Sequence, residues 1–98
     1  MFAQEIIDAF VKFIHDSGGT YYQWYIGIAS DPEKRLFNVH MVDRKNDTWK
    51  YENAGSEKNA RTIEKYLMDK FGAQGDTGSG DSNTTYVYAY RISDTTSE

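Results

Sequence analysis

Two stretches of this chain alternate their side chains with the period of a β-strand, and this constrains the fold more than any other feature. Residues 20–29 (TYYQWYIGIA) carry large apolar or aromatic side chains at every second position, and residues 84–92 (TTYVYAYRI) alternate tyrosines with small apolar residues. Successive side chains of a strand point to opposite faces of a sheet. We therefore expect two strands, with Tyr25 on the face of the first strand that points away from the main core.

Helical patterns precede and follow the first of these strands. Apolar residues recur at helical spacing through residues 1–16, and a Ser-Gly-Gly sequence then stops the pattern. After the strand, residues 30–33 (SDPE) have the serine and glutamate spacing of a capping box. This spacing predicts a second helix that runs to about His40 and packs Leu36 inward.

A further strand and helix are expected before the C-terminal strand. Residues 48–53 (TWKYEN) are typical of a strand, and Ser56 is a suitable cap for a helix that ends at Gly72. Residues 72–83 are too rich in glycine to form a regular element and indicate a loop.

The predicted fold class is α+β, with a small three-stranded antiparallel sheet and three helices. A chain of 98 residues is long enough for one core, so residues 1–98 are expected to form a single domain. Its core would span residues 20–92, and the polar residues 93–98 are expected to fray.

Composition excludes several classes of function. The chain has no cysteine, so it has no disulfide, no thiolate nucleophile and no cysteine-containing zinc site. It also lacks an apolar run of membrane-spanning length, which predicts a soluble protein without membrane contact and a cytoplasmic location.

The net charge of -4 argues against long-range attraction of nucleic acid. However, nine of the eleven lysines and arginines lie in residues 31–70, where the charge is close to neutral. This distribution is compatible with a local phosphate-binding site.

One carboxylate interrupts the apolar stripe of the third predicted helix. Glu64 shares a face with four apolar residues at spacings of three and four. A carboxylate in such a position is costly unless it is paired or binds a metal. Periodicity alone favours an ion pair with Arg61, Lys65 or Arg35 over a metal site.

The sequence Tyr25-Ile26-Gly27, followed by DPEKRL with Arg35 and later by Glu64 and a glycine-rich loop, resembles the GIY-YIG nuclease domain. In that family the YIG half ends a strand, an arginine lies on the next helix, and a glutamate on a later helix binds a divalent metal. The resemblance covers about residues 24–80. It implies that Tyr25 is the YIG tyrosine, that Arg35 is the helix arginine, and that Glu64 binds Mg²⁺ or Mn²⁺.

The GIY half of the motif has no counterpart upstream of the YIG half. One resolution is that residues 84–92 supply the missing strand and pair beside residues 21–29. In this hypothesis Tyr86, Tyr88 or Tyr90 replaces the tyrosine of the first motif. A structure that separated the two strands would rule it out.

The chemistry that the resemblance implies is hydrolysis of a phosphodiester in nucleic acid. A tyrosine near Tyr25 would orient or deprotonate water, Arg35 would neutralise charge on the phosphate oxygens, and a metal on Glu64 would stabilise the leaving oxygen. His40 more often packs in such a position than acts as a base, but the resemblance makes it a further candidate catalytic residue.

Two other classes of function remain open. The chain could be a catalytically inactive domain of the same shape, acting as a small acidic module that binds a protein partner. It could also bind single-stranded nucleic acid by stacking bases on the tyrosines of residues 84–92, although its acidic charge ranks this interpretation last.

Overall fold

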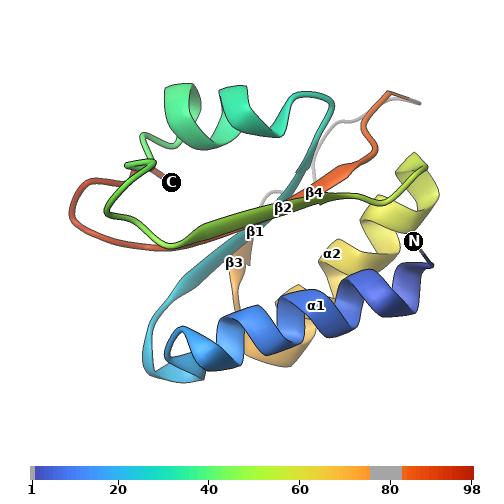
Figure 1. Ribbon diagram of the computed structural model, residues 1–98, viewed down its shortest axis with the longest axis horizontal. Coiled ribbons are helices and arrows are strands. Elements are labelled where there is room, and N and C mark those ends of the chain that lie inside the picture. Colours follow the sequence, from blue (N-terminus) through green and yellow to red (C-terminus); the bar gives the residue numbers. More distant parts are fainter. Residues whose placement is uncertain (1, 76–82) are drawn as a thin grey trace.

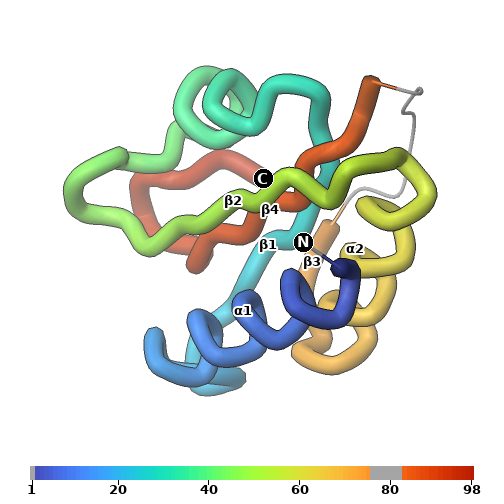
Figure 2. The backbone as a smooth tube through the Cα atoms, turned by 45° about the vertical axis from the view of Figure 1, so that its right-hand side comes forward, coloured from blue at the N-terminus to red at the C-terminus, as the bar shows by residue number. Residues whose placement is uncertain are grey.

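The sheet of this protein lies between a pair of helices and a third, shorter helical segment (Figures 1 and 2). The structure is a computed structural model, which describes residues 2–75 and 83–98. Most of the glycine-rich loop predicted at residues 72–83 therefore lies outside the described residues. In order along the chain the elements are α1 (Ala3–Asp16), the 3-10 helix η1 (Gly19–Tyr21), β1 (Trp24–Ala29), the π-helix η2 (Lys34–Val39), β2 (Trp49–Asn53), α2 (Glu57–Phe71), β3 (Gln74–Gly75) and β4 (Tyr86–Arg91).

The sheet has four strands in the order β2-β4-β1-β3. The C-terminal strand β4 pairs antiparallel with β1, which places Tyr88 opposite Gly27 and Tyr90 opposite Tyr25. The adjacency expected of these two strands is thus confirmed. The prediction of three antiparallel strands is wrong, because the short β3 adds a parallel pairing between Gln74 and Tyr25. Two residues are too few to show a strand period in the sequence.

Helices α1 and α2 cover one face of the sheet. The core on this side includes Ile6, Phe10, Ile14, Trp24, Ile26, Ile63, Leu67 and Val87. Ser56 caps α2 as predicted, because its Oγ accepts a hydrogen bond from the Asn59 N–H at 3.1 Å, and Gly72 ends the helix with a φ of 60°. Within the described ranges, no helix combines the length and apolar character needed to cross a lipid bilayer.

The opposite face of the sheet is buried beneath η2. A second cluster of buried side chains fills this layer, and it consists of Tyr25, Ala29, Leu36, Val42, Tyr88 and Tyr90. Tyr25 does point away from the first core, as the alternation predicted. Tyr88 and Tyr90 are only 1% and 0% exposed, so the hypothesis that they stack on bases is wrong. A tyrosine stripe on a strand looks the same in sequence whether one face of the sheet is covered or both.

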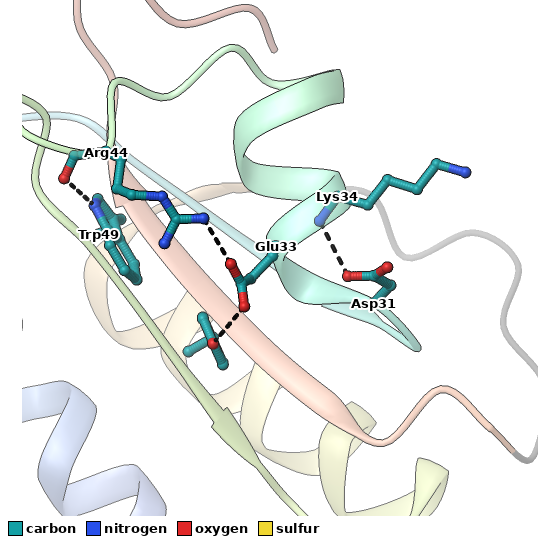
Figure 3. A network of polar contacts seen from close by, with 6 residues as sticks. Asp31, Glu33, Lys34, Arg44 and Trp49 are labelled. Atoms are coloured by element: carbon teal, nitrogen blue, oxygen red, sulfur yellow. Dashed lines mark hydrogen bonds and ion pairs between the residues drawn. The ribbon is translucent and has the colours of Figure 1, made fainter.

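The second predicted helix is present, but its start and its geometry differ from expectation. The side-chain hydrogen bond at its start comes from Asp31 and not from Ser30, because Asp31 Oδ1 accepts from the Lys34 N–H at 3.1 Å (Figure 3). The segment is π-helical, with the His40 N–H donating to the Arg35 carbonyl at 2.9 Å. Met41 follows with a φ of 59°, the left-handed conformation that often ends a helix.

The polar segment 93–98, which we name the tail segment, was expected to fray. It instead folds back against the layer beneath η2 (Figure 1). Ser93 Oγ and Thr95 Oγ1 donate hydrogen bonds to the two carboxylate oxygens of Asp47 at 2.7 and 2.6 Å. The Ser97 N–H donates to the His40 carbonyl at 2.6 Å. The hydroxyls that made this segment look solvated are the groups that hold it in place.

Candidate functional site

Tyr88 lies at the centre of a buried polar cluster between β4 and η2. Its hydroxyl is 3.0 Å from Nε2 of His40, and it also accepts a hydrogen bond from Arg35. Nδ1 of His40 is 2.8 Å from the Ser97 carbonyl. Since a carbonyl can only accept, Nδ1 carries the ring proton of a neutral imidazole and Nε2 accepts the hydrogen bond of Tyr88. The polar atoms of this cluster therefore form one continuous chain from Arg35 to Ser97.

Glycine at position 27 makes room for Tyr88. A Cβ atom on Gly27 would come within 2.4 Å of both Cζ and Oη of Tyr88. The tyrosine ring therefore crosses β1 directly over this residue. The glycine of the Tyr25-Ile26-Gly27 sequence thus has a steric role in the structure.

The π-helix explains how Arg35 and His40 reach the same tyrosine. In a regular α-helix, residues five apart, such as Arg35 and His40, face different sides. The hydrogen bond from the His40 N–H to the Arg35 carbonyl widens the turn to five residues. The side chains of Arg35 and His40 consequently both form hydrogen bonds with the Tyr88 hydroxyl.

Contacts of Glu33, the residue just before η2, with Arg44 and with Tyr51 of β2 hold the start of η2 in place (Figure 3). Glu33 accepts hydrogen bonds from Arg44 at 2.6 Å and from the Tyr51 hydroxyl at 3.2 Å. These contacts lower the pKa of Glu33, with the Arg44 hydrogen bond as the main cause. Trp49 Nε1 in turn donates to the Arg44 carbonyl at 3.0 Å. These contacts tie the residues just before Arg35 to the edge strand of the sheet.

Arg35 and Tyr88 line a pocket of about 370 Å³ that opens to solvent. Polar side chains from three segments surround it, and those of the described residues are Ser30, Asp31, Lys34, Arg35, Thr84 and Tyr88. Two cations and several hydroxyls face one acid here, although the chain as a whole is acidic. The pocket therefore offers the local positive charge and donors that an anionic group such as a phosphate requires.

Burial raises the pKa of Tyr88 to about 12. The hydrogen bond from Arg35 opposes this shift, while the nearby Tyr25 and Glu64 contribute to it. Tyr88 is consequently protonated at neutral pH. It can donate a hydrogen bond or relay a proton, but it does not stand ready as a tyrosinate.

Burial likewise lowers the pKa of His40, although the hydrogen bond to Ser97 opposes the shift. The charge of Arg35 lowers this pKa further, and that of Glu98 raises it. His40 is 2% exposed and is neutral at neutral pH. Its Nε2 atom is thus available as a proton acceptor toward Tyr88.

The stability of the protein should fall in mild acid because of His40. Its folded-state pKa lies below the ordinary value of 6.5. The unfolded chain therefore binds a proton that the folded chain resists, so this contribution is complete above pH 6.5 and is lost as the pH falls below it. We expect urea unfolding to show a steeper loss of stability below pH 6.5 in the wild type than in His40→Gln. The same substitution at the exposed His15 is the matched control, and equal slopes for wild type and His40→Gln would contradict the prediction.

The other tyrosines proposed from sequence lie apart from this pocket wall. Tyr25 stacks on Tyr90 with ring centroids 5.3 Å apart, and its ring lies 4.5 Å from that of His40. Tyr86 is half-buried and meets the ring of Tyr51 edge-on at 5.9 Å, beside a smaller pocket of about 270 Å³. Tyr25 packs against His40 at the edge of the polar cluster around Tyr88, and Tyr86 lies outside that cluster.

Glu64 is buried on α2, as its place in the apolar stripe predicted, and is only 2% exposed. It lines a pocket of about 350 Å³ together with Arg61, Lys65, Met68 and Asp69. Glu64 is not one of the described residues that line the pocket of Arg35 and Tyr88. It is nevertheless close enough to Tyr88 to raise the pKa of that hydroxyl.

The described residues contain no group of three or more histidine, aspartate or glutamate side chains arranged to hold a metal. The donor chemistry of Glu64 still suits Mg²⁺ or Mn²⁺, because these ions prefer oxygen ligands. Mg²⁺ in particular retains several waters and often uses one or two carboxylates. Glu64 supplies one such carboxylate, which is 2% exposed.

Sequence reasoning missed Ser97 and the tail segment as parts of the site. The contribution of Ser97 is a backbone carbonyl and N–H, which every residue type except proline carries. No side-chain pattern could have signalled it.

Comparisons with family models, with curated proteins and with solved structures found no match to this chain.

Proposed function

We propose that this protein is a metal-dependent phosphodiesterase that cleaves nucleic acid through a GIY-YIG-like site. The observation that carries the proposal is the hydrogen-bonded chain of Arg35, Tyr88 and His40 at the wall of a polar pocket. The adjacency of β4 and β1 supports it further, because β4 then supplies the tyrosine expected of the missing first motif.

In this mechanism Tyr88 relays a proton from the attacking water to His40. As the water oxygen forms its bond to phosphorus, the water gives a proton to Tyr88 Oη, and Tyr88 passes its own proton to Nε2 of His40. The bond from phosphorus to the leaving oxygen breaks, and that oxygen takes a proton from solvent. The raised pKa of Tyr88 favours this relay over attack assisted by a preformed tyrosinate.

Arg35 stabilises the negative charge that grows on the phosphate oxygens. Its guanidinium lines the pocket with Lys34, and its contact with Tyr88 fixes it beside the hydroxyl that handles the proton. A planar guanidinium binds two phosphate oxygens at once, which a lysine cannot do. We therefore assign transition-state stabilisation to Arg35 and assign substrate binding to Lys34.

Glu64 is the residue that would hold the Mg²⁺ or Mn²⁺ ion. When bound, the ion would supply positive charge that stabilises the leaving oxygen. Glu64 is buried on α2, and its charge contributes to the raised pKa of Tyr88, which supports a place near the reacting groups.

Cleavage of labelled single- and double-stranded DNA and RNA with Mg²⁺ or Mn²⁺ tests this proposal. We expect cutting to be about 10²-fold slower than the wild type in Arg35→Ala and in Tyr88→Phe, since the first removes the guanidinium that stabilises the phosphate charge and the second removes the hydroxyl that relays the proton. Glu64→Gln should lose the stimulation of cutting by Mg²⁺ or Mn²⁺, because it removes the proposed metal ligand. Lys45→Ala is the matched control, because it removes an exposed cation outside the pocket. Absence of cutting by the wild type with every substrate and metal would overturn the proposal.

A second candidate is a catalytically inactive domain of the same shape that binds a protein partner. The position of Glu64 favours it, because the carboxylate lines a different pocket from Arg35 and shares that pocket with Arg61 and Lys65. In that case Glu64→Gln would change stability alone. A wild-type protein that does not cut would move the search to protein partners.

A further inference from the structure

The tail segment contacts the Nδ1 atom of the His40 ring, whereas Tyr88 contacts the Nε2 atom. The Ser97 carbonyl lies 2.8 Å from Nδ1 of His40, and the Ser97 N–H donates to the His40 carbonyl at 2.6 Å. Glu98 accepts a hydrogen bond from the Tyr90 hydroxyl at 3.1 Å, and that hydroxyl is 3.1 Å from the same Nδ1 atom. Ser97 thus contacts Nδ1 directly, whereas Glu98 acts on it through the Tyr90 hydroxyl.

These contacts admit one arrangement of protons. The Tyr90 hydroxyl donates to the Glu98 carboxylate, so its oxygen can only accept from Nδ1. The Ser97 carbonyl also only accepts. Both neighbours therefore require a proton on Nδ1, and a neutral ring then has its lone pair on Nε2, directed at Tyr88. Among the described residues, the charged and titratable side chains that face His40 are Tyr25, Arg35, Tyr88, Tyr90 and Glu98.

We propose that the tail segment is a positioning element for the candidate site, in which the Ser97 carbonyl holds His40 as the Nδ1-protonated tautomer so that Nε2 accepts from Tyr88. The consequence for activity rests on the proposed function, whereas the tautomer does not. Without the tail segment, the Ser97 carbonyl would be lost and the Tyr90 hydroxyl, no longer bound to Glu98, could donate to Nδ1. The ring would then be free to carry its proton on Nε2 instead. In that tautomer Nε2 donates to Tyr88 and cannot receive its proton.

The anchoring of the tail segment supports this role. Its two hydroxyl contacts to Asp47 attach it to the connection between η2 and β2, so the segment is fixed at both of its ends. A backbone carbonyl held in this way gives a rigid acceptor at a constant distance. The comparable arrangement, in which a fixed acceptor selects the histidine tautomer, is a general means of preparing an imidazole as a base.

The first test is the ¹⁵N NMR signature of the His40 ring in the full chain at neutral pH. We expect Nδ1 to be protonated and Nε2 to be unprotonated. A wild-type ring with the proton on Nε2 would overturn the proposal, and this measurement needs no variant.

The second test is a variant that stops after Thr96 and so removes the Ser97 carbonyl. We expect its His40 ring to shift toward the Nε2-protonated tautomer. Glu98→Gln is the matched control, because it keeps an oxygen that can accept from Tyr90 and leaves Ser97 in place, so its tautomer should match the wild type. An unchanged tautomer in the folded truncated protein would contradict the proposal.

Activity then separates this inference from the proposed function. If the wild type cuts nucleic acid, the truncated variant should lose about tenfold or more of its cleavage rate, as expected for a base in the wrong tautomer. If the wild type does not cut but the tautomer changes on truncation, the proposed function fails and the positioning of His40 stands. Full activity after a complete change of tautomer would overturn the positioning role.

Discussion

Replacing Leu36 with alanine is expected to destabilise the folded chain by about 2–5 kcal/mol. Leu36 is 0% exposed and is the buried residue of η2. It fills the layer between the π-helix and the tyrosines of the sheet. Its removal leaves a cavity in a cluster that contains three buried tyrosines, whose large rings cannot easily shift to close it. Urea unfolding at neutral pH measures the change.

The exposed Val39 offers a matched control for this substitution. It lies on the same π-helix and is 42% exposed, so Val39→Ala should change the free energy of unfolding by less than about 0.5 kcal/mol. A loss below about 1 kcal/mol for Leu36→Ala would mean that η2 does not form a true second core. The proposed site would then lack the rigid cover that brings Arg35 and His40 to Tyr88.

The features that sequence predicted correctly are those decided by neighbouring residues. Ser56 caps α2 and Gly72 ends it, because these roles depend on a local hydroxyl and on local backbone freedom. The alternation in residues 20–29 likewise assigned Tyr25 to the correct face of β1. These elements follow from periods and caps that the chain displays directly.

The features that sequence missed depend on contacts between distant segments. Strand β3 consists of two residues, and it exists only because β1 offers an open edge beside it. The tail segment is ordered by Asp47 and His40, which lie far from it in sequence. Neither leaves a periodic pattern, so no reading of the local sequence could have located them.

The candidate site shows the same division. The resemblance to GIY-YIG domains singled out Arg35 and Glu64, and alternation along the last strand offered Tyr88 as one of three tyrosines. Only the register between β4 and β1 selects Tyr88, because it lies opposite Gly27, where its ring has space to cross. The link from Tyr88 to His40 required the π-helical turn, whose spacing differs from the α-helical period assumed from sequence.

Gly27→Val is the second substitution for which we expect a large effect. The backbone of Gly27 is not in the left-handed region, so any cost arises from space and not from φ. A single Cβ would already come within 2.4 Å of the Tyr88 ring, and valine adds two methyl groups to it. Overpacking of a tight core typically costs about 1–3 kcal/mol and occasionally more. Because the Cβ alone already overlaps the ring, we expect the free energy of unfolding in urea to fall by about 3 kcal/mol or more.

A double-mutant cycle with Tyr88→Leu identifies the cause. The leucine side chain lacks the ring atoms that meet position 27, so Gly27→Val should cost at least about 1 kcal/mol less in the Tyr88→Leu background than in the wild type. Valine itself suits a strand, which removes backbone propensity as an explanation. Equal costs in the two backgrounds would show that Tyr88 does not cross β1 over Gly27. The hydrogen bonds from Tyr88 to Arg35 and His40 would then need a different geometry, and the relay built on them would lose its basis.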